Sequence, residues 1–159
     1  MTTTRVYIVF YSGKLMDFQT ISELSGVDPS HIEVKGEQKI GHTGKMLKLQ
    51  TKGGECVPLV YLHNAFIYDL PASHGKYVSR LFNQLMRAIK NPKQLGEYCK
   101  AHGIKVFVQV VLEGITDTYS VPAVHLGWKF ISFLADLNNA EVDFDYYTEP
   151  WEIDDEYQP

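Results

Sequence analysis

The chain has 159 residues, of which 45% are hydrophobic and 21% charged, and its formal net charge at pH 7 is −4. This composition is ordinary for a globular protein of one domain. No apolar stretch approaches the ~20 residues that a membrane helix requires, and Cys56 and Cys99 are too few for a disulfide scaffold. We therefore expect a cytoplasmic protein without a targeting segment, and the pattern leaves one Cys56–Cys99 bridge open.

The first part of the chain predicts a strand, a capped helix and a second extended segment. Residues 5–12 are β-branched and aromatic, which is typical of a strand. Asp17 is placed to cap the helix that follows, and Gly26 is placed to end it. Residues 31–35 come after a turn and are expected to be extended.

The next segment predicts a hairpin followed by irregular chain. Residues 36–45 are rich in glycine and charge, which is typical of a loop. Residues 46–51 alternate in a pattern that predicts a half-buried antiparallel strand. A second strand over residues 57–62 is expected at an edge, because it contains Pro58. Residues 63–75 are expected to be irregular.

The middle of the chain predicts two helices and a strand. Residues 76–90 have one apolar stripe with basic residues outside it, and they give the clearest helix. Residues 94–102 predict another helical piece that ends at Gly103. Residues 104–113 alternate valine with other side chains, which predicts a strong strand.

The last part predicts a helix and a final strand. Ser120 is placed to cap the helix. Its predicted core stripe comprises Val124, Gly127, Trp128, Ile131, Leu134 and Ala135. The strand is expected to turn Val142, Phe144 and Tyr146 inward and Glu141, Asp143 and Asp145 toward water.

Together these elements predict an α+β fold with a mainly antiparallel sheet and helices on one face. Residues 6–35 and residues 104–147 each read as a β-α-β unit, and they enclose the hairpin and a central helix. This order indicates a ferredoxin-like duplication. We expect a single α+β domain over residues 1–148 and an acidic tail over residues 149–159.

Five short segments resemble an uncharacterised bacterial family of small domains of unknown function. They are the strand Val6–Phe10, the helix Ile21–Leu24, the loop Val27–Ser30, the tripeptide Lys35–Glu37 and the late segment Phe133–Tyr146. The resemblance spans about residues 5–148. It implies an α+β fold and supplies no reaction, so the function must be argued from the residues themselves.

Charge is distributed unevenly along the chain. Residues 141–159 hold eight acidic residues and no Lys or Arg, whereas the other 140 residues hold 15 basic and 11 acidic residues. Acids mixed with aromatic residues are typical of a contact with a basic protein, although a solubilising tail has the same composition. The candidate partner-binding residues are Asp143, Asp145, Glu149, Trp151, Glu152, Asp154, Asp155 and Glu156.

A second candidate site lies in the stretch between two histidines. His63 and His74 flank Tyr68 and Asp69, and a histidine with a carboxylate and a tyrosine supports acid–base chemistry or ligand binding. No nucleophile motif accompanies these residues. The alternative interpretation is a loop whose polar groups satisfy its own backbone.

We expect no metal site, no cofactor and no nucleic-acid partner. Cys99 and His102 are three residues apart on a predicted helix, but paired Cys-x-x-Cys spacing is absent. The lysines of residues 35–52 match no recognised nucleic-acid module, and they are typical of a solvated hairpin.

The leading hypothesis from the sequence is a non-enzymatic protein-binding domain, in its sharper form an immunity-type inhibitor of a basic toxin such as a nuclease. One alternative is a small-molecule-binding domain or enzyme that uses the His63–His74 loop. Another alternative is a structural subunit that forms homodimers by pairing of sheet edges, since the oligomeric state is not readable from the sequence.

Overall fold

The computed structural model describes residues 2–41, 44–74, 78–114 and 124–147. Its helices are α1 (Phe18–Ser25), α2 (Val78–Ala88), α3 (Pro92–His102) and α4 (Trp128–Asp136). The strands of the main sheet are β1 (Thr3–Ser12), β2 (His31–Glu33), β5 (Asn64–Asp69), β6 (Ser73–His74), β7 (Lys105–Glu113) and β8 (Glu141–Tyr146). A separate two-stranded sheet consists of β3 (Lys48–Gln50) and β4 (Cys56–Pro58).

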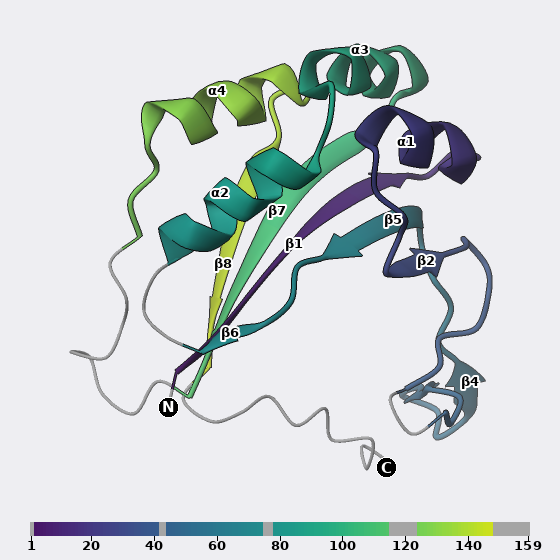
Figure 1. The fold of residues 1–159 in the computed structure, drawn as a ribbon. Helices are drawn as coiled ribbons and strands as arrows, with labels where there is room; N and C mark the ends of the chain where they lie inside the picture. Colours follow the sequence, from purple (N-terminus) through teal and green to yellow (C-terminus); the bar gives the residue numbers. More distant parts are fainter. Residues whose placement is uncertain (1, 42–43, 75–77, 115–123, 148–159) are drawn as a thin grey trace.

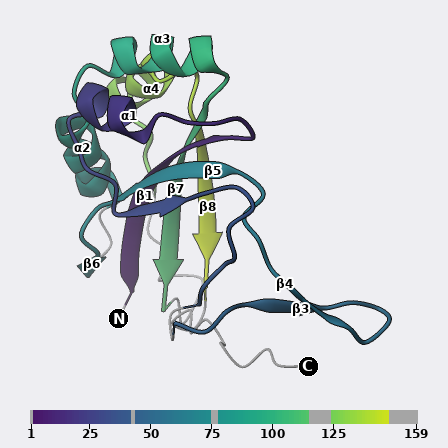
Figure 2. The ribbon, with the colours of Figure 1, turned by 90° about the vertical axis from the view of Figure 1, so that its right-hand side faces the viewer.

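The main sheet has the order β2-β5-β1-β7-β8, and β6 pairs with the beginning of β1. All of its pairs are antiparallel except β7 with β8. In this register Tyr7 of β1 lies between Asp69 of β5 and Gln109 of β7. The four helices lie over one face of the sheet (Figures 1 and 2). The predicted α+β class with a mainly antiparallel sheet is therefore confirmed.

The predicted β-α-β units differ in how their strands meet. The strands β1 and β2 run parallel, but β5 is inserted between them. The strands β7 and β8 are direct parallel neighbours. In addition, β5 and β7 run parallel to each other on either side of β1, because each is antiparallel to it.

The core fills the space between the sheet and the helices. Phe10 of β1 meets Phe66 of β5 edge to face, with ring centroids 5.8 Å apart. Phe82 of α2 stacks on Phe130 of α4 at 4.0 Å. The core also includes Ile21 of α1 and residues of α3, so all four helices contribute to one hydrophobic cluster. Burial of such side chains is the dominant favourable contribution to folding.

The helix ends follow the predicted chemistry. The Asp17 carboxylate accepts a hydrogen bond from the backbone N–H of Thr20 at 3.1 Å and so caps α1. Gly26 ends α1 with φ of 73°, and Gly103 ends α3 with φ of 65°. These left-handed conformations favour glycine, because a Cβ would crowd the following carbonyl.

The prediction that residues 63–75 are irregular is wrong. Residues Asn64–Asp69 form β5, which pairs with β1 on one side and β2 on the other. Ala65 and Phe66 are buried in the sheet interior, and the strand ends before Pro71, which therefore breaks no ladder. The predicted His63–His74 loop is thus a strand that crosses the sheet.

The predicted core stripe of the last helix is also partly wrong. Trp128 is 75% exposed and Ile131 is 53% exposed. The buried residues of α4 are Phe130, Phe133 and Leu134. Stacking of Phe130 on Phe82 turns that side of the helix toward the core. The predicted cap at Ser120 lies outside the described residues.

The predicted hairpin exists, but it is not half-buried. Leu49 of β3 pairs with Val57 of β4 in an antiparallel ladder. Every residue of both strands is exposed. The reason is that this small sheet extends away from the main sheet and from the described helices, as Figure 2 shows. We call residues 36–61 the arm.

Both cysteines are free thiols in the structure. Cys56 lies exposed on β4, whereas Cys99 of α3 is buried. Burial raises the pKa of the Cys99 thiol to about 12, because a thiolate is poorly solvated in an apolar environment. Among the described helices, none combines the length and apolar character needed to cross a membrane.

Gly96 provides a test of how closely α3 and α4 pack. A Cβ at this position would collide with the backbone oxygen of Asp136 and lie 2.8 Å from the backbone nitrogen of Asn138. We expect Gly96→Ala to lower the free energy of unfolding by roughly 1–3 kcal/mol, because neither backbone group can move independently. Gly13→Ala, which has no atom within 4 Å, is the matched control. Equal denaturant midpoints for the two variants would contradict the close packing.

Candidate functional site

The face of the sheet opposite the helices is the candidate functional surface. In β1 the side chains of Val6, Ile8 and Phe10 enter the core. Alternation along a strand therefore directs Arg5 and Tyr7 to the opposite face. No described helix covers that side (Figure 2), and we call it the open face.

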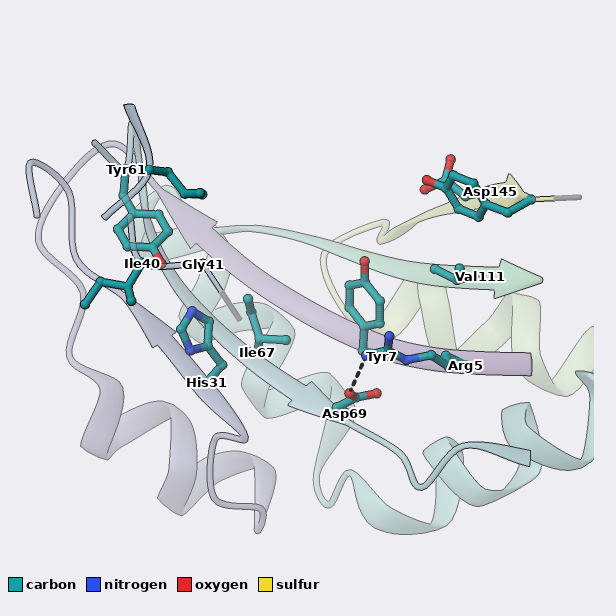
Figure 3. Close-up of a pocket in the computed structure, with 12 residues that line it drawn as sticks. Arg5, Tyr7, His31, Ile40, Gly41, Tyr61, Ile67, Asp69, Val111 and Asp145 are labelled. Atoms are coloured by element: carbon teal, nitrogen blue, oxygen red, sulfur yellow. Dashed lines mark hydrogen bonds and ion pairs between the residues drawn. The ribbon is translucent and has the colours of Figure 1, made fainter. Parts of the chain in front are cut away.

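A cavity of about 470 Å³ lies on the open face. Its lining combines residues of the main sheet with residues of the arm: Arg5, Tyr7, His31, Ile40, Gly41, Leu47, Tyr61, Ile67, Asp69, Val111, Asp145 and Tyr147. Figure 3 shows Tyr7 rising from β1 between Asp69 and Asp145, with His31 and Tyr61 across the cavity. The site is therefore built by β2, β5, β1, β7 and β8 together with the arm.

Arg5 is held by two carboxylates. Its Nη2 atom lies 3.4 Å from Oδ2 of Asp69, and its Nη1 atom lies 4.0 Å from Oε1 of Glu113. The other oxygen of Asp69, Oδ1, is buried and has no hydrogen-bond partner among the described residues. Buried acceptors are normally paired, so this oxygen marks a position where a donor would be favourable.

Asp145 is held in a different way. The side-chain amide of Gln109 donates a hydrogen bond to its Oδ2 atom at 2.8 Å. Gln109 is almost fully buried, which restricts its rotamer and so fixes the position of the carboxylate. Within the described residues Asp145 forms no ion pair.

The pKa of Tyr7 is raised above its ordinary value. The main cause is burial of the phenol, which disfavours the charged phenolate. The negative charge of Asp145 raises the pKa further, and the positive charge of Arg5 opposes this effect. Tyr7 is therefore a neutral hydroxyl at physiological pH that can both donate and accept a hydrogen bond.

The arm forms the other wall of the cavity. Tyr61 contacts His31 of β2, with ring centroids 6.4 Å apart. The ammonium group of Lys39 lies 5.4 Å from the centroid of the Tyr61 ring. Ile40 and Leu47 add apolar surface at the base of the arm. A cavity with apolar walls and a few fixed polar groups is typical of a binding site.

The polar groups of the lining are two aspartates, three tyrosines, one histidine and one arginine among the described residues. That part of the lining contains no serine, threonine or cysteine. No group of three or more histidine, cysteine or carboxylate side chains is placed to hold a metal ion in the part of the chain that the structure describes.

The structure does not bring the second candidate set into one site. Asn64, next to His63, pairs with Ser12, whereas His74 pairs with Thr3 at the other end of β1. At about 3.3 Å per residue, this places the two histidines roughly 30 Å apart. Tyr68 packs against the core and Asp69 faces the open side. Asp69 alone of these residues lines the cavity.

The first candidate set is only partly described. Asp143 and Asp145 pair with Gln109 and Val111 on the open face, as the predicted alternation of β8 requires. The remaining six residues lie outside the described part of the chain: Glu149, Trp151, Glu152, Asp154, Asp155 and Glu156. Asp145 and Asp69, which come from the two separate candidate sets, line the same cavity.

Sequence reasoning missed Arg5, Tyr7 and Gln109. The available signal was alternation, because these polar residues lie between core positions in β1 and β7. A strand that is half buried beneath helices must present its alternate residues on the opposite face. The identity of their neighbours depends on the strand order, which local patterns do not contain.

The electrostatic coupling of Tyr7 can be tested by titration. We expect Asp145→Asn to lower the Tyr7 pKa, because removing a neighbouring negative charge makes the phenolate less unfavourable. Arg5→Met should raise it, and Glu141→Gln, at the other end of β8, should leave it unchanged. NMR of ¹³C-labelled tyrosine rings measures each value. An unaltered Tyr7 titration in Asp145→Asn would show that the two groups are not coupled.

Comparison with known proteins places the chain in a family. No curated protein and no solved structure matches it. A family model described as a domain of unknown function (DUF4279) matches residues 2–149. The match includes all the described residues that line the cavity, from Arg5 to Tyr147. It agrees with the resemblance expected over about residues 5–148. The chain therefore belongs to the DUF4279 family of domains of unknown function.

Proposed function

We propose that this protein is a non-enzymatic, cytoplasmic protein-binding domain that contacts its partner through the arm and the open face. The observation that carries this proposal is the exposed apolar surface of the arm, which lies next to the cavity. The apolar side chains exposed there are Ile40, Met46, Leu49, Val57 and Val60.

The arm is a structure that gains stability from a contact. The strands β3 and β4 pair only with each other among the described residues, and none of their side chains is buried. Backbone hydrogen bonds among Lys39, Leu47 and Leu59 continue the pairing to the base of the arm. A two-stranded sheet without a buried face is nevertheless marginally stable in water. Exposed apolar side chains that pair across strands, as Leu49 does with Val57 and Ile40 with Met46, are also typical of protein-interaction sites. A partner that covers Leu49 and Val57 would remove both unfavourable features.

The charge on the β8 side of the open face supports a basic partner group there, whereas the arm has four lysines and two glutamates. Asp143 and Asp145 lie on that side, and the Arg5 charge is already shared by Asp69 and Glu113. Acidic side chains beside apolar contacts steer a basic protein toward the surface and then fix its register. The sharper form of the proposal is an immunity-type inhibitor that occupies a basic toxin such as a nuclease.

A small-molecule-binding domain is the second candidate. The cavity of about 470 Å³ favours it, because small-molecule sites commonly enclose about 300–1,000 Å³. In this candidate Asp69 contacts the ligand. His63, Tyr68 and His74 do not line the cavity. A small ligand in the cavity would leave the apolar side chains of the arm exposed to water, so protein binding explains more of the structure.

We also propose that the sheet derives from a ferredoxin-like duplication. The order β2-β5-β1-β7, with two pairs of parallel strands each separated by a third strand, supports this relation. In this interpretation β8 is an addition at the edge, which supplies Asp145 to the cavity.

The arm is tested with the partner that the protein captures from its native host. We expect Leu49→Ser to weaken binding of the purified partner by roughly tenfold or more, because burying a leucine contributes about 1.5–3 kcal/mol. Calorimetry measures the dissociation constant. Gln50→Ser, an exposed substitution on the opposite face of the same strand, is the matched control. Equal affinities for the two variants would show that the apolar face of the arm does not contact the partner.

Charge steering is tested with the same partner. We expect the double variant Asp143→Asn, Asp145→Asn to associate roughly threefold to tenfold more slowly at low salt. The difference should vanish near 1 M salt, where the screening length is about 3 Å. Glu97→Gln, on α3 and away from the open face, should leave the association rate unchanged. A wild-type salt dependence in the double variant would contradict steering by β8.

A further inference from the structure

The cavity holds one carboxylate that no cation neutralises within the described residues. Asp69 and Glu113 share the charge of Arg5. In the described part of the chain, Asp145 accepts a hydrogen bond from the neutral amide of Gln109 and has no ion pair. Three strand spacings, or about 14 Å, separate β5 from β8, so Arg5 in its contact with Asp69 does not also pair with Asp145. The β8 side of the cavity therefore has an unbalanced negative charge.

Asp145 is also preorganised as an acceptor. Gln109 occupies its Oδ2 atom, and pairing with Val111 fixes its backbone. Figure 3 shows Asp145 on the β8 side of the cavity, across from Tyr7. An acceptor that is already in place loses little conformational entropy when a ligand binds. Asp145 is consequently suited to a charge-assisted hydrogen bond with an incoming cation.

The rest of the lining suits the apolar part of such a ligand. Val111 and Ile67 lie on the sheet, and Ile40 and Leu47 lie on the arm. Lysine and arginine combine a charged end with an aliphatic stem that packs on apolar surface. Aromatic faces such as that of Tyr61 also attract cations, and the contact of Lys39 with Tyr61 is an example within this chain.

We propose that the cavity is a specificity pocket for one lysine or arginine side chain of the partner protein. The cation lies against Asp145 and the Tyr7 hydroxyl, and the aliphatic stem packs on Val111, which pairs with Asp145. This inference rests on the proposed protein-binding function and names the chemical group that the site recognises.

A side chain of a protein fits better than a free amine. The cavity wall continues into the exposed apolar surface of the arm through Ile40, which is 61% exposed, and through Met46, which pairs with it. A partner that inserts a basic residue would cover this adjoining surface with its neighbouring residues. A free amine would fill the acidic end and leave the apolar rim in water.

The pocket is tested with three capped tripeptides of the form Gly-X-Gly, in which X is lysine, arginine or norleucine. We expect the two basic peptides to shift the amide NMR signals of Tyr7, Val111 and Asp145 saturably, and the norleucine peptide to bind at least tenfold more weakly. Asp145→Asn should weaken the basic peptides at least tenfold, while Glu141→Gln should keep wild-type affinity. An unchanged melting temperature of Asp145→Asn shows that the loss does not come from unfolding.

Two results would overturn the pocket. One is equal binding of the norleucine and lysine peptides, and the other is wild-type binding of the basic peptides by Asp145→Asn. A titration with butylamine separates the two sources of the cation. Weaker binding of butylamine than of the lysine peptide supports a side chain, whereas equal or tighter binding would overturn the assignment to a protein partner.

A failure of the proposed pocket can be distinguished from a failure of the proposed protein-binding function. Leu49→Ser lies on the arm outside the cavity and should leave the peptide titration unchanged. If this variant weakens the captured partner while no basic peptide binds, the pocket is wrong and protein binding stands. If the peptides bind as expected while the partner tolerates Leu49→Ser, the role of the arm fails and the pocket stands.

Discussion

The pairing of β1 with a strand on each side is the constraint on which the rest of the structure depends. Its antiparallel ladders with β5 and β7 run along most of its length. They fix which side chains share a face, so that Val6, Ile8 and Phe10 lie beneath the helices while Arg5 and Tyr7 face away. A slip of one residue would exchange these sets and place a guanidinium in the core. The hydrophobic effect on one face therefore determines the chemistry of the other.

The coexistence of a covered and an uncovered face explains why the candidate site resembles a binding surface. The helices bury the apolar side of the sheet against Phe82 and Phe130, which leaves the open side free to carry charge. On that side the ionic groups are partly matched internally, since Arg5 lies between Asp69 and Glu113. Among the described residues, the carboxylates of Asp143 and Asp145 have no cation partner, and the apolar side chains of the arm remain exposed. Affinity at such a surface would come from apolar contact, and orientation from the charge.

Local patterns predicted those elements whose residues define their own partners. The capped helix α1, the apolar stripe of α2 and the alternating valines of β7 each carry a complete signal within one segment. The strand β5 carries a weaker signal, because its strand-favouring run of Phe66, Ile67 and Tyr68 is short and is flanked by polar or small residues. Its place is set by pairing with β1 and β2. For the same reason, local patterns did not predict which residues form the candidate site. Asp69 and Asp145 are 76 residues apart in the chain, and only the strand order brings them to one cavity.

The wall of the cavity that carries Asp145 belongs to an edge strand, β8, and this position affects how readily the wall opens. This strand is paired on one side only within the described sheet, and it carries Asp145. Edge elements with few buried contacts open locally at lower free energy than the centre of a sheet. The backbone amides of β8 should therefore exchange their hydrogens sooner than those of the other strands that line the cavity. A group that binds Asp145 only in the closed arrangement would slow that exchange, so occupancy of the cavity and anchoring of the last strand are thermodynamically linked.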